Sequence, residues 1–174
     1  MPVAEERALL VVLGGLPGAG KSTLANALAE RLGVMHLRID TIEQAMRDAG
    51  QTVAGPEGYL VAREVARANL RLGLPVIIDA VNPIAYTRKL WQEMSAATGA
   101  RLVEIELVCG DSAEHRHRVE SRTVDIDGLR LPTWQDVLER EYEPWTTAHA
   151  IDTGGRSVDD CLEAIVARLP SRLA

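Results

Sequence analysis

Lysine is scarce in this sequence. Of the 19 basic residues in a chain of 174, only Lys21 and Lys89 are lysines. Acidic residues outnumber basic ones, and the formal net charge is −6. Broad, non-specific binding of nucleic acid requires a basic face, so this balance argues against a nucleic-acid partner, although a local basic pocket is compatible with it. Because lysine is so rare, a lysine inside a glycine-rich motif is informative.

Long apolar runs and paired cysteines are also missing. No run reaches the roughly 18–20 apolar residues that a helix needs to span a bilayer. The first seven residues are acidic and lack the apolar stretch of a signal peptide. The two cysteines, Cys109 and Cys161, match no metal or redox spacing. We therefore expect a cytoplasmic protein with reduced thiols and no membrane partner.

Short apolar runs alternate with helical patterns along the chain. Such an alternation predicts βαβ units, and hence an α/β fold with a parallel sheet and helices on both faces. A chain of this length fits a single domain, 1–174. The predicted strands are 8–13, 35–39, 76–79, 102–108 and 149–152, and the predicted helices are 21–32, 41–49, 56–72, 83–98, 112–122 and 157–169.

The stretch from residue 123 to about 147 carries no strand signal. Thr133 is followed three residues later by Asp136, a spacing that predicts a capped short helix. Segments of this length between regular elements are usually lids or disordered. Its two tryptophans, Trp134 and Trp145, favour a packed lid.

A phosphate-binding motif lies between the first predicted strand and the first predicted helix. Its glycines allow the backbone to curl until successive N–H groups point inward, where they bind an anion together with the positive end of the helix dipole. We expect Lys21 to reach the β- and γ-phosphates of ATP, Ser22 to ligate Mg²⁺ and Thr23 to lie near the α-phosphate. There are two alternatives to a working ATP site. The motif could be a glycine-rich turn that binds no nucleotide, or a site that binds ATP without turnover. The motif G-x-x-x-x-G-K-[ST] is matched by Gly15, Leu16, Pro17, Gly18, Ala19, Gly20, Lys21 and Ser22.

Two aspartates end predicted strands, where ligands bind in parallel sheets. Asp79 follows the apolar run Val76–Ile78 and is predicted to hold Mg²⁺; alternatively it caps a helix or accepts a turn hydrogen bond. Asp40 is predicted to act as the general base that accepts the proton of an acceptor hydroxyl. Its alternative role is to cap the helix that follows.

Arginines precede the predicted lid. Arg118 and Arg122 are four residues apart, so in a helix 112–122 they share one face. Lid closure would bring them over the γ-phosphate to neutralise its transition-state charge. The alternative is a solvated face with glutamate partners.

Two further pairs of polar residues stand near these arginines. His115 and His117 are expected to face solvent rather than to bind metal. Asp125 and Asp127, in the lid, resemble a metal pair only superficially, and we expect them to be solvated.

With these residues placed, the sequence from 9 to 169 resembles the kinase-like branch of P-loop NTPases. This branch includes polynucleotide kinase domains, chloramphenicol phosphotransferases, zeta toxins, and shikimate and gluconate kinases. The sequence is most similar to bacterial proteins known only as AAA-family ATPases or predicted kinases. The resemblance implies a three-layer sandwich with five parallel strands in the order 2-3-1-4-5, which places Asp79 within reach of Mg²⁺ on Ser22.

The resemblance also implies roles at the two ends of the site. The family's acceptor-side aspartate matches Asp40, and the loop after its last strand, here 153–156 with Arg156, usually touches adenine. Polynucleotide kinases carry an arginine three residues after the aspartate, where this chain has Glu43, and this weakens a nucleic-acid acceptor. Arg38 either binds an anion on the acceptor or is a surface charge at a strand end.

The sequence therefore predicts a kinase that moves the γ-phosphate of ATP onto a hydroxyl of a small molecule, with the acceptor wall at 41–72. The alternatives are an ATPase or switch without an acceptor, a 5′-hydroxyl polynucleotide kinase, and a binding module. A monomer and a homodimer both fit.

Overall fold

The computed structural model of the chain describes residues 7–170, so the acidic residues 1–6 lie outside it. Its sheet has five strands, all parallel, in the order β2-β3-β1-β4-β5. This confirms the fold and the strand order that the sequence resemblance implies. The strands are β1 (Leu9–Gly14), β2 (Met35–Arg38), β3 (Val76–Asp79), β4 (Arg101–Val108) and β5 (His149–Asp152).

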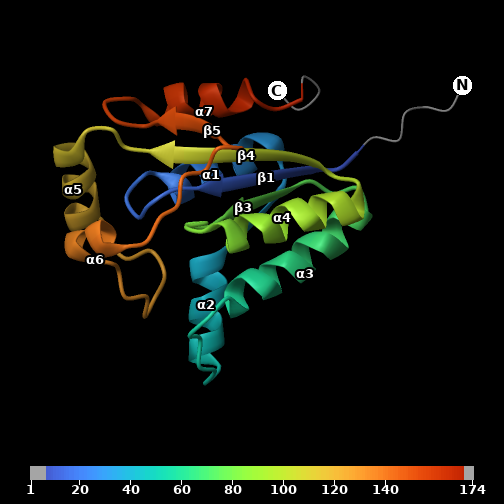
Figure 1. Cartoon of the computed structure of the whole chain (residues 1–174), viewed down its shortest axis with the longest axis horizontal. Helices are drawn as coiled ribbons and strands as arrows, with labels where there is room; N and C mark the ends of the chain where they lie inside the picture. The colour runs from blue at the N-terminus through green and yellow to red at the C-terminus, as the bar shows by residue number, and fades with distance from the viewer. Residues whose placement is uncertain (1–6, 171–174) are drawn as a thin grey trace, which may run out of the picture.

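Helices cover both faces of the sheet, and two more lie beyond the carboxyl ends of the strands (Figure 1). Helices α3 and α4 pack on one face, whereas α1 and α7 pack on the other. Within residues 7–170, none of the helices is both long and apolar enough to cross a membrane. The helices are α1 (Lys21–Leu32), α2 (Ile39–Asp48), α3 (Glu57–Arg71), α4 (Ala85–Thr98), α5 (Ser112–Ser121), α6 (Trp134–Glu139) and α7 (Val158–Val166).

The continuous apolar run of β1 supplies both halves of the core. Successive side chains of a strand point to opposite faces, so a central strand between two helical layers is apolar at every position. Leu9, Val11 and Leu13 belong to the cluster with α1 and α7. Leu10 and Val12 belong to the cluster with α3 and α4. The carboxyl end of this buried strand is therefore held rigidly where the chain enters the phosphate motif.

Several element boundaries differ from the prediction by one to three residues, and those of α2 and α5 matter for the site. The β2–β3 ladder ends with Arg38 opposite Asp79, so α2 begins at Ile39 and Asp40 lies in its first turn rather than at a strand end. Helix α5 ends at Ser121, and Arg122 takes an extended backbone with φ −66° and ψ 144°. The prediction that Arg118 and Arg122 share a helix face is therefore wrong.

The segment after α6 is anchored firmly beside β1. Trp145 is 6% exposed, and its ring centroid lies 4.9 Å from the guanidinium carbon of the buried Arg88. The same ring packs on Gly14, where an added Cβ would lie 2.2 Å from a ring carbon. Four backbone carbonyl oxygens accept hydrogen bonds from Arg88, namely those of Asn82, Pro83, Glu143 and Pro144.

We predict that Gly14→Ala destabilises the protein by ~1–3 kcal/mol, because the new methyl group overpacks the ring of Trp145. Chemical denaturation measures the change in the free energy of unfolding. Gly55→Ala is the control, since a Cβ there meets nothing closer than 3.4 Å. Equal unfolding midpoints for the two variants would contradict this packing.

Candidate active site

The phosphate motif adopts the curled backbone that the sequence predicts. Gly15, Gly18 and Gly20 have φ values of 134°, 84° and 94°, which L side chains rarely adopt. The N–H of Gly15 donates to the carbonyl oxygen of Val81 at 3.1 Å. A Cβ on Gly15 would lie 2.2 Å from the carbonyl oxygen of Leu107, so the loop is seated against β4. Gly18 and Gly20 line a pocket, where a phosphate group could approach the backbone of the loop.

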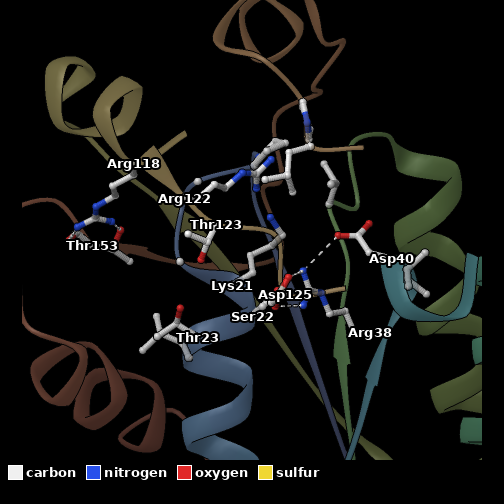
Figure 2. A pocket seen from close by; sticks show the side chains of 18 of the residues that line it. Lys21, Ser22, Thr23, Arg38, Asp40, Arg118, Arg122, Thr123, Asp125 and Thr153 are labelled. Atoms are coloured by element: carbon white, nitrogen blue, oxygen red, sulfur yellow. Dashed lines mark hydrogen bonds and ion pairs between the residues drawn. The ribbon is translucent and has the colours of Figure 1, made fainter. Parts of the chain in front are cut away.

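Lys21 and Ser22 open α1 directly after this loop and line a pocket of about 840 Å³ (Figure 2). The ammonium group of Lys21 donates to the carbonyl oxygen of Leu16 at 3.0 Å. Burial lowers the pKa of Lys21, and the nearby carboxylates of Asp79 and Asp40 only partly oppose this effect. A buried cation in this position is poised to pair with an arriving phosphate. Thr23 lines the same pocket.

Asp79 is a buried carboxylate at the end of β3, beside β1, and is 2% exposed. Within residues 7–170 its Oδ2 atom has no hydrogen-bond partner. The cap of α4 is Ile84, which excludes the capping alternative. A buried carboxylate oxygen without a partner, near a serine hydroxyl, is a donor set that suits Mg²⁺. The residues predicted to hold the metal therefore fit it.

His36 is a member of this site that the sequence did not reveal. Its Nε2 atom lies 3.4 Å from Oδ2 of Asp79. Burial alone would raise the pKa of Asp79, but the His36 ring and the charge on Lys21 hold it below its usual value. The carboxylate is thus ionised and ready to accept a cation. Only the pairing of β2 with β3 brings the histidine there, and no local pattern signals it.

Asp40 lies in the first turn of α2 and lines the pocket opposite Lys21 (Figure 2). The N-cap of α2 is Arg38, so the predicted alternative role of Asp40 as a cap is excluded. The carboxylate of Asp40 is exposed, and its closest charged neighbour is Nη2 of Arg38 at 3.8 Å. It is therefore available to an incoming hydroxyl group.

The structure separates the two arginines that the sequence grouped together. Arg118 donates to a carboxylate oxygen of Glu114 at 2.5 Å and to the backbone and side-chain oxygens of Thr153 at 2.8 and 2.9 Å. Arg122 instead has two buried donors, Nε and Nη2, that find no partner among residues 7–170. Figure 2 shows Arg118 turned toward Thr153 and Arg122 turned toward Lys21. Arg122 is therefore the arginine available to a phosphate.

Arg38 is a pocket residue and not a surface charge. Its side chain is 16% exposed, and its Nη1 and Nη2 atoms donate to the two carboxylate oxygens of Asp125 at 2.5 and 3.3 Å. Asp125 is exposed, as predicted, but its pairing with Arg38 was not predicted. Arg156 also lines the pocket, where it donates to the carbonyl oxygens of Asp152 and Asp160.

His115 contradicts the prediction of a solvent-facing side chain. It is 7% exposed, and its Nε2 atom lies 2.8 Å from the carbonyl oxygen of Pro17. The ring also meets the ring of Trp134 edge to face, at 5.2 Å between centroids. Val119 is four residues later, on the same face of α5, and is also buried. This face packs on the phosphate loop at Gly18. The apolar Val119 was the available signal.

Comparison with known proteins shows the family to which the chain belongs. The model of a family described as an AAA domain matches residues 10–140. A shikimate kinase of Thermobifida fusca is 35% identical over 170 residues, which cover 93% of this chain and 95% of that protein. An uncharacterized protein of Mycobacterium tuberculosis (strain H37Rv) is 28% identical over 84% of this chain. The chain spans only 32% of the length of that relative.

Solved structures share the fold. The APS kinase of Mycobacterium tuberculosis, in complex with AMPPNP and APS, superposes with a TM-score of 0.68. The match covers 92% of this chain and 96% of the kinase, at 20% identity. At that identity the likeness concerns the fold.

We predict that Lys21→Ala lowers the affinity for ATP by at least about tenfold, because a hydrogen bond to a charged group contributes ~1.5–3 kcal/mol. Isothermal titration calorimetry measures the affinity. Lys89→Ala is the matched control, since this lysine is exposed and pairs only with Glu93. Unchanged ATP affinity in Lys21→Ala would refute the assigned phosphate site.

Proposed function

The chain belongs to the AAA domain family and is a kinase-like P-loop NTPase, and on that premise we propose that it is a kinase that uses Mg-ATP. The proposed reaction moves the γ-phosphoryl group to a hydroxyl of a small molecule. A new bond forms between the hydroxyl oxygen and the γ-phosphorus while the bond to the β,γ-bridging oxygen breaks, and ADP leaves with the electron pair. We also propose that the chain is one domain with a lid at 123–147.

One observation carries this proposal. Lys21 follows the phosphate loop, Asp40 begins α2 and Arg122 follows α5, yet all three line one pocket. Their segments are separate in sequence, and the strand order β2-β3-β1-β4 brings them together. A cation, a free carboxylate and unpaired guanidinium donors in one pocket are the groups that phosphoryl transfer requires.

Each residue has a proposed role. Asp40 orients the acceptor hydroxyl and accepts its proton as the new bond forms. Lys21 and Arg122 pair with the γ-phosphate, whose charge spreads over its equatorial oxygens in the transition state. Arg118 holds Thr153 beside the phosphate loop, because Thr153 in turn donates to the carbonyl oxygen of Ala19 at 3.1 Å.

The remaining roles concern the metal and the base of ATP. Ser22 and Asp79 would hold Mg²⁺, which supplies neutralisation of phosphate charge when bound. We propose that Arg156 contacts the adenine end of ATP, since it lines the pocket on the side of β5 and α7.

We predict that Asp40→Asn leaves the affinity for ATP unchanged and lowers kcat by ~100- to 10,000-fold, the usual contribution of a general base. Calorimetry and a coupled assay of ADP release measure the two quantities. Asp159→Asn, on the exposed first turn of α7, is the control. Full activity of Asp40→Asn would refute the role of base.

The two arginines give a second test. Arg122→Gln should lower kcat by ~100-fold, because it removes a donor aimed at developing charge. Arg118→Gln should lower kcat much less, since that side chain is already engaged by Glu114 and Thr153. Steady-state kinetics under saturating ATP measure both values, and equal losses would contradict the distinction.

An ATPase without an acceptor is the competing function, because the same cradle also serves hydrolysis. A panel of hydroxyl-bearing acceptors separates the two, with nucleosides, sugars, shikimate and 5′-hydroxyl oligonucleotides among them. ADP release stimulated by an acceptor, with a phosphorylated product in the mass spectrum, supports the kinase. Release that no acceptor changes supports the ATPase.

A further inference from the structure

The contact between Arg38 and Asp125 closes the acceptor end of the pocket. The two residues are 87 positions apart, on β2 and on the segment between α5 and α6. The guanidinium group of Arg38 donates to both carboxylate oxygens of Asp125, at 2.5 and 3.3 Å. Figure 2 shows the pair beside Asp40 and Lys21, within the pocket. A two-point contact of this kind is how arginine binds a free carboxylate.

The two partners are unequally fixed. Arg38 is 16% exposed and stays near Asp40 and Asp79, at 3.8 Å from each, on the rigid edge of the sheet. Asp125 is 55% exposed and comes from a segment without regular structure. Its carboxylate can be withdrawn from the pocket, whereas the guanidinium group of Arg38 remains there.

The charges around Arg38 determine what can replace Asp125. The cations of Lys21, Arg38, Arg122 and Arg140 lie near the carboxylates of Asp40, Asp79 and Asp125. Among residues 7–170, two buried donors of the Arg122 guanidinium group have no partner. If Asp125 leaves, Arg38 loses its two-point partner and keeps the more distant carboxylates of Asp40 and Asp79, each at 3.8 Å. A carboxylate on a ligand restores the two-point contact.

We propose that Asp125 occupies the place of a carboxylate on the acceptor, so that the acceptor is a hydroxy acid. This inference rests on the proposed kinase function and names its substrate class. The acceptor carboxylate takes the two Arg38 donors, and its hydroxyl reaches Asp40. Because Nη2 of Arg38 lies only 3.8 Å from Oδ2 of Asp40, the two groups of the acceptor are separated by few bonds. Asp125 and the substrate carboxylate then compete for the guanidinium group of Arg38.

Pairs of hydroxy acids and their methyl esters test the charge requirement. Glycerate and gluconate are compared with their esters, and glycerol phosphate represents a dianion. Calorimetry with the Mg-ADP complex measures binding without turnover, and a coupled assay measures acceptor-stimulated ADP release with ATP. We expect each acid to bind at least about tenfold tighter than its ester, since a charge-assisted contact to arginine is lost in the ester.

Variants of the internal carboxylate provide the second test. Asp125→Asn should bind the acids several-fold tighter than the wild type and leave binding of the esters unchanged, because the competitor has lost its charge. Asp127→Asn is the matched control, since Asp127 is an exposed aspartate on the same segment. Arg38→Gln should remove the preference of acid over ester.

The outcomes separate this inference from the proposed function. Esters or glycerol phosphate that bind as well as the acids would overturn the carboxylate assignment, even if the protein proves to be a kinase. Weaker binding of acid and ester alike in Asp125→Asn would also overturn it, because Asp125 would then only hold the lid. Acid-selective binding without any phosphoryl transfer would support the anion site and refute the kinase.

Discussion

The close approach of Gly15 to the carbonyl group of Leu107 is the constraint on which the site depends. A single Cβ atom at this position would lie 2.2 Å from that oxygen. The loop therefore rests directly on β4, and the N–H of Gly15 binds back to Val81 after β3. Both neighbours of β1 hold the cradle, so its amides are oriented before any anion arrives. Preorganised donors of this kind cost no reorganisation when charge develops on a phosphate.

The strand order also determines where Asp79, Arg38 and Asp40 lie relative to the phosphate loop. β3 lies beside β1 and places Asp79 at the depth of Ser22, while β2 at the edge places Arg38 and the start of α2 farther out. A buried carboxylate therefore lies behind the pocket and an exposed one lines it. Burial follows the same order, from 2% exposure at Asp79 to a freely exposed carboxylate at Asp40. The buried carboxylate suits a bound cation, and the exposed one suits proton exchange with a hydroxyl.

Sequence patterns predicted those parts of the protein that depend on contiguous residues. The phosphate loop is one run, and the strands β3 and β5 were predicted with their observed ends. The capping box of α6 was likewise visible in Thr133 and Asp136. The resemblance to a known branch supplied the strand order, which composition and periodicity do not contain.

Long-range contacts were beyond these patterns. Arg118 and Arg122 look equivalent at a spacing of four, but only Arg118 meets a threonine 35 residues away. His115 looked like a surface residue: Val119, four residues later, marks the apolar face of α5, but the sequence does not show that this face packs on the phosphate loop. Asp125 looked solvated, because its partner is on an edge strand that precedes it by 87 residues. In each case the decisive partner was distant in the chain.

These distant contacts hold the segment from α5 to β5 differently along its length. Its end is fixed by four hydrogen bonds from the buried Arg88, and α6 rests on His115 through Trp134. Its beginning is held to β2 by the pair of Asp125 with Arg38, in which Asp125 is exposed, and ion pairs open to solvent contribute little stability. The proposed acceptor carboxylate would therefore replace a contact that costs little to break. The contact of His115 with the carbonyl oxygen of Pro17 holds the phosphate loop independently of this pair.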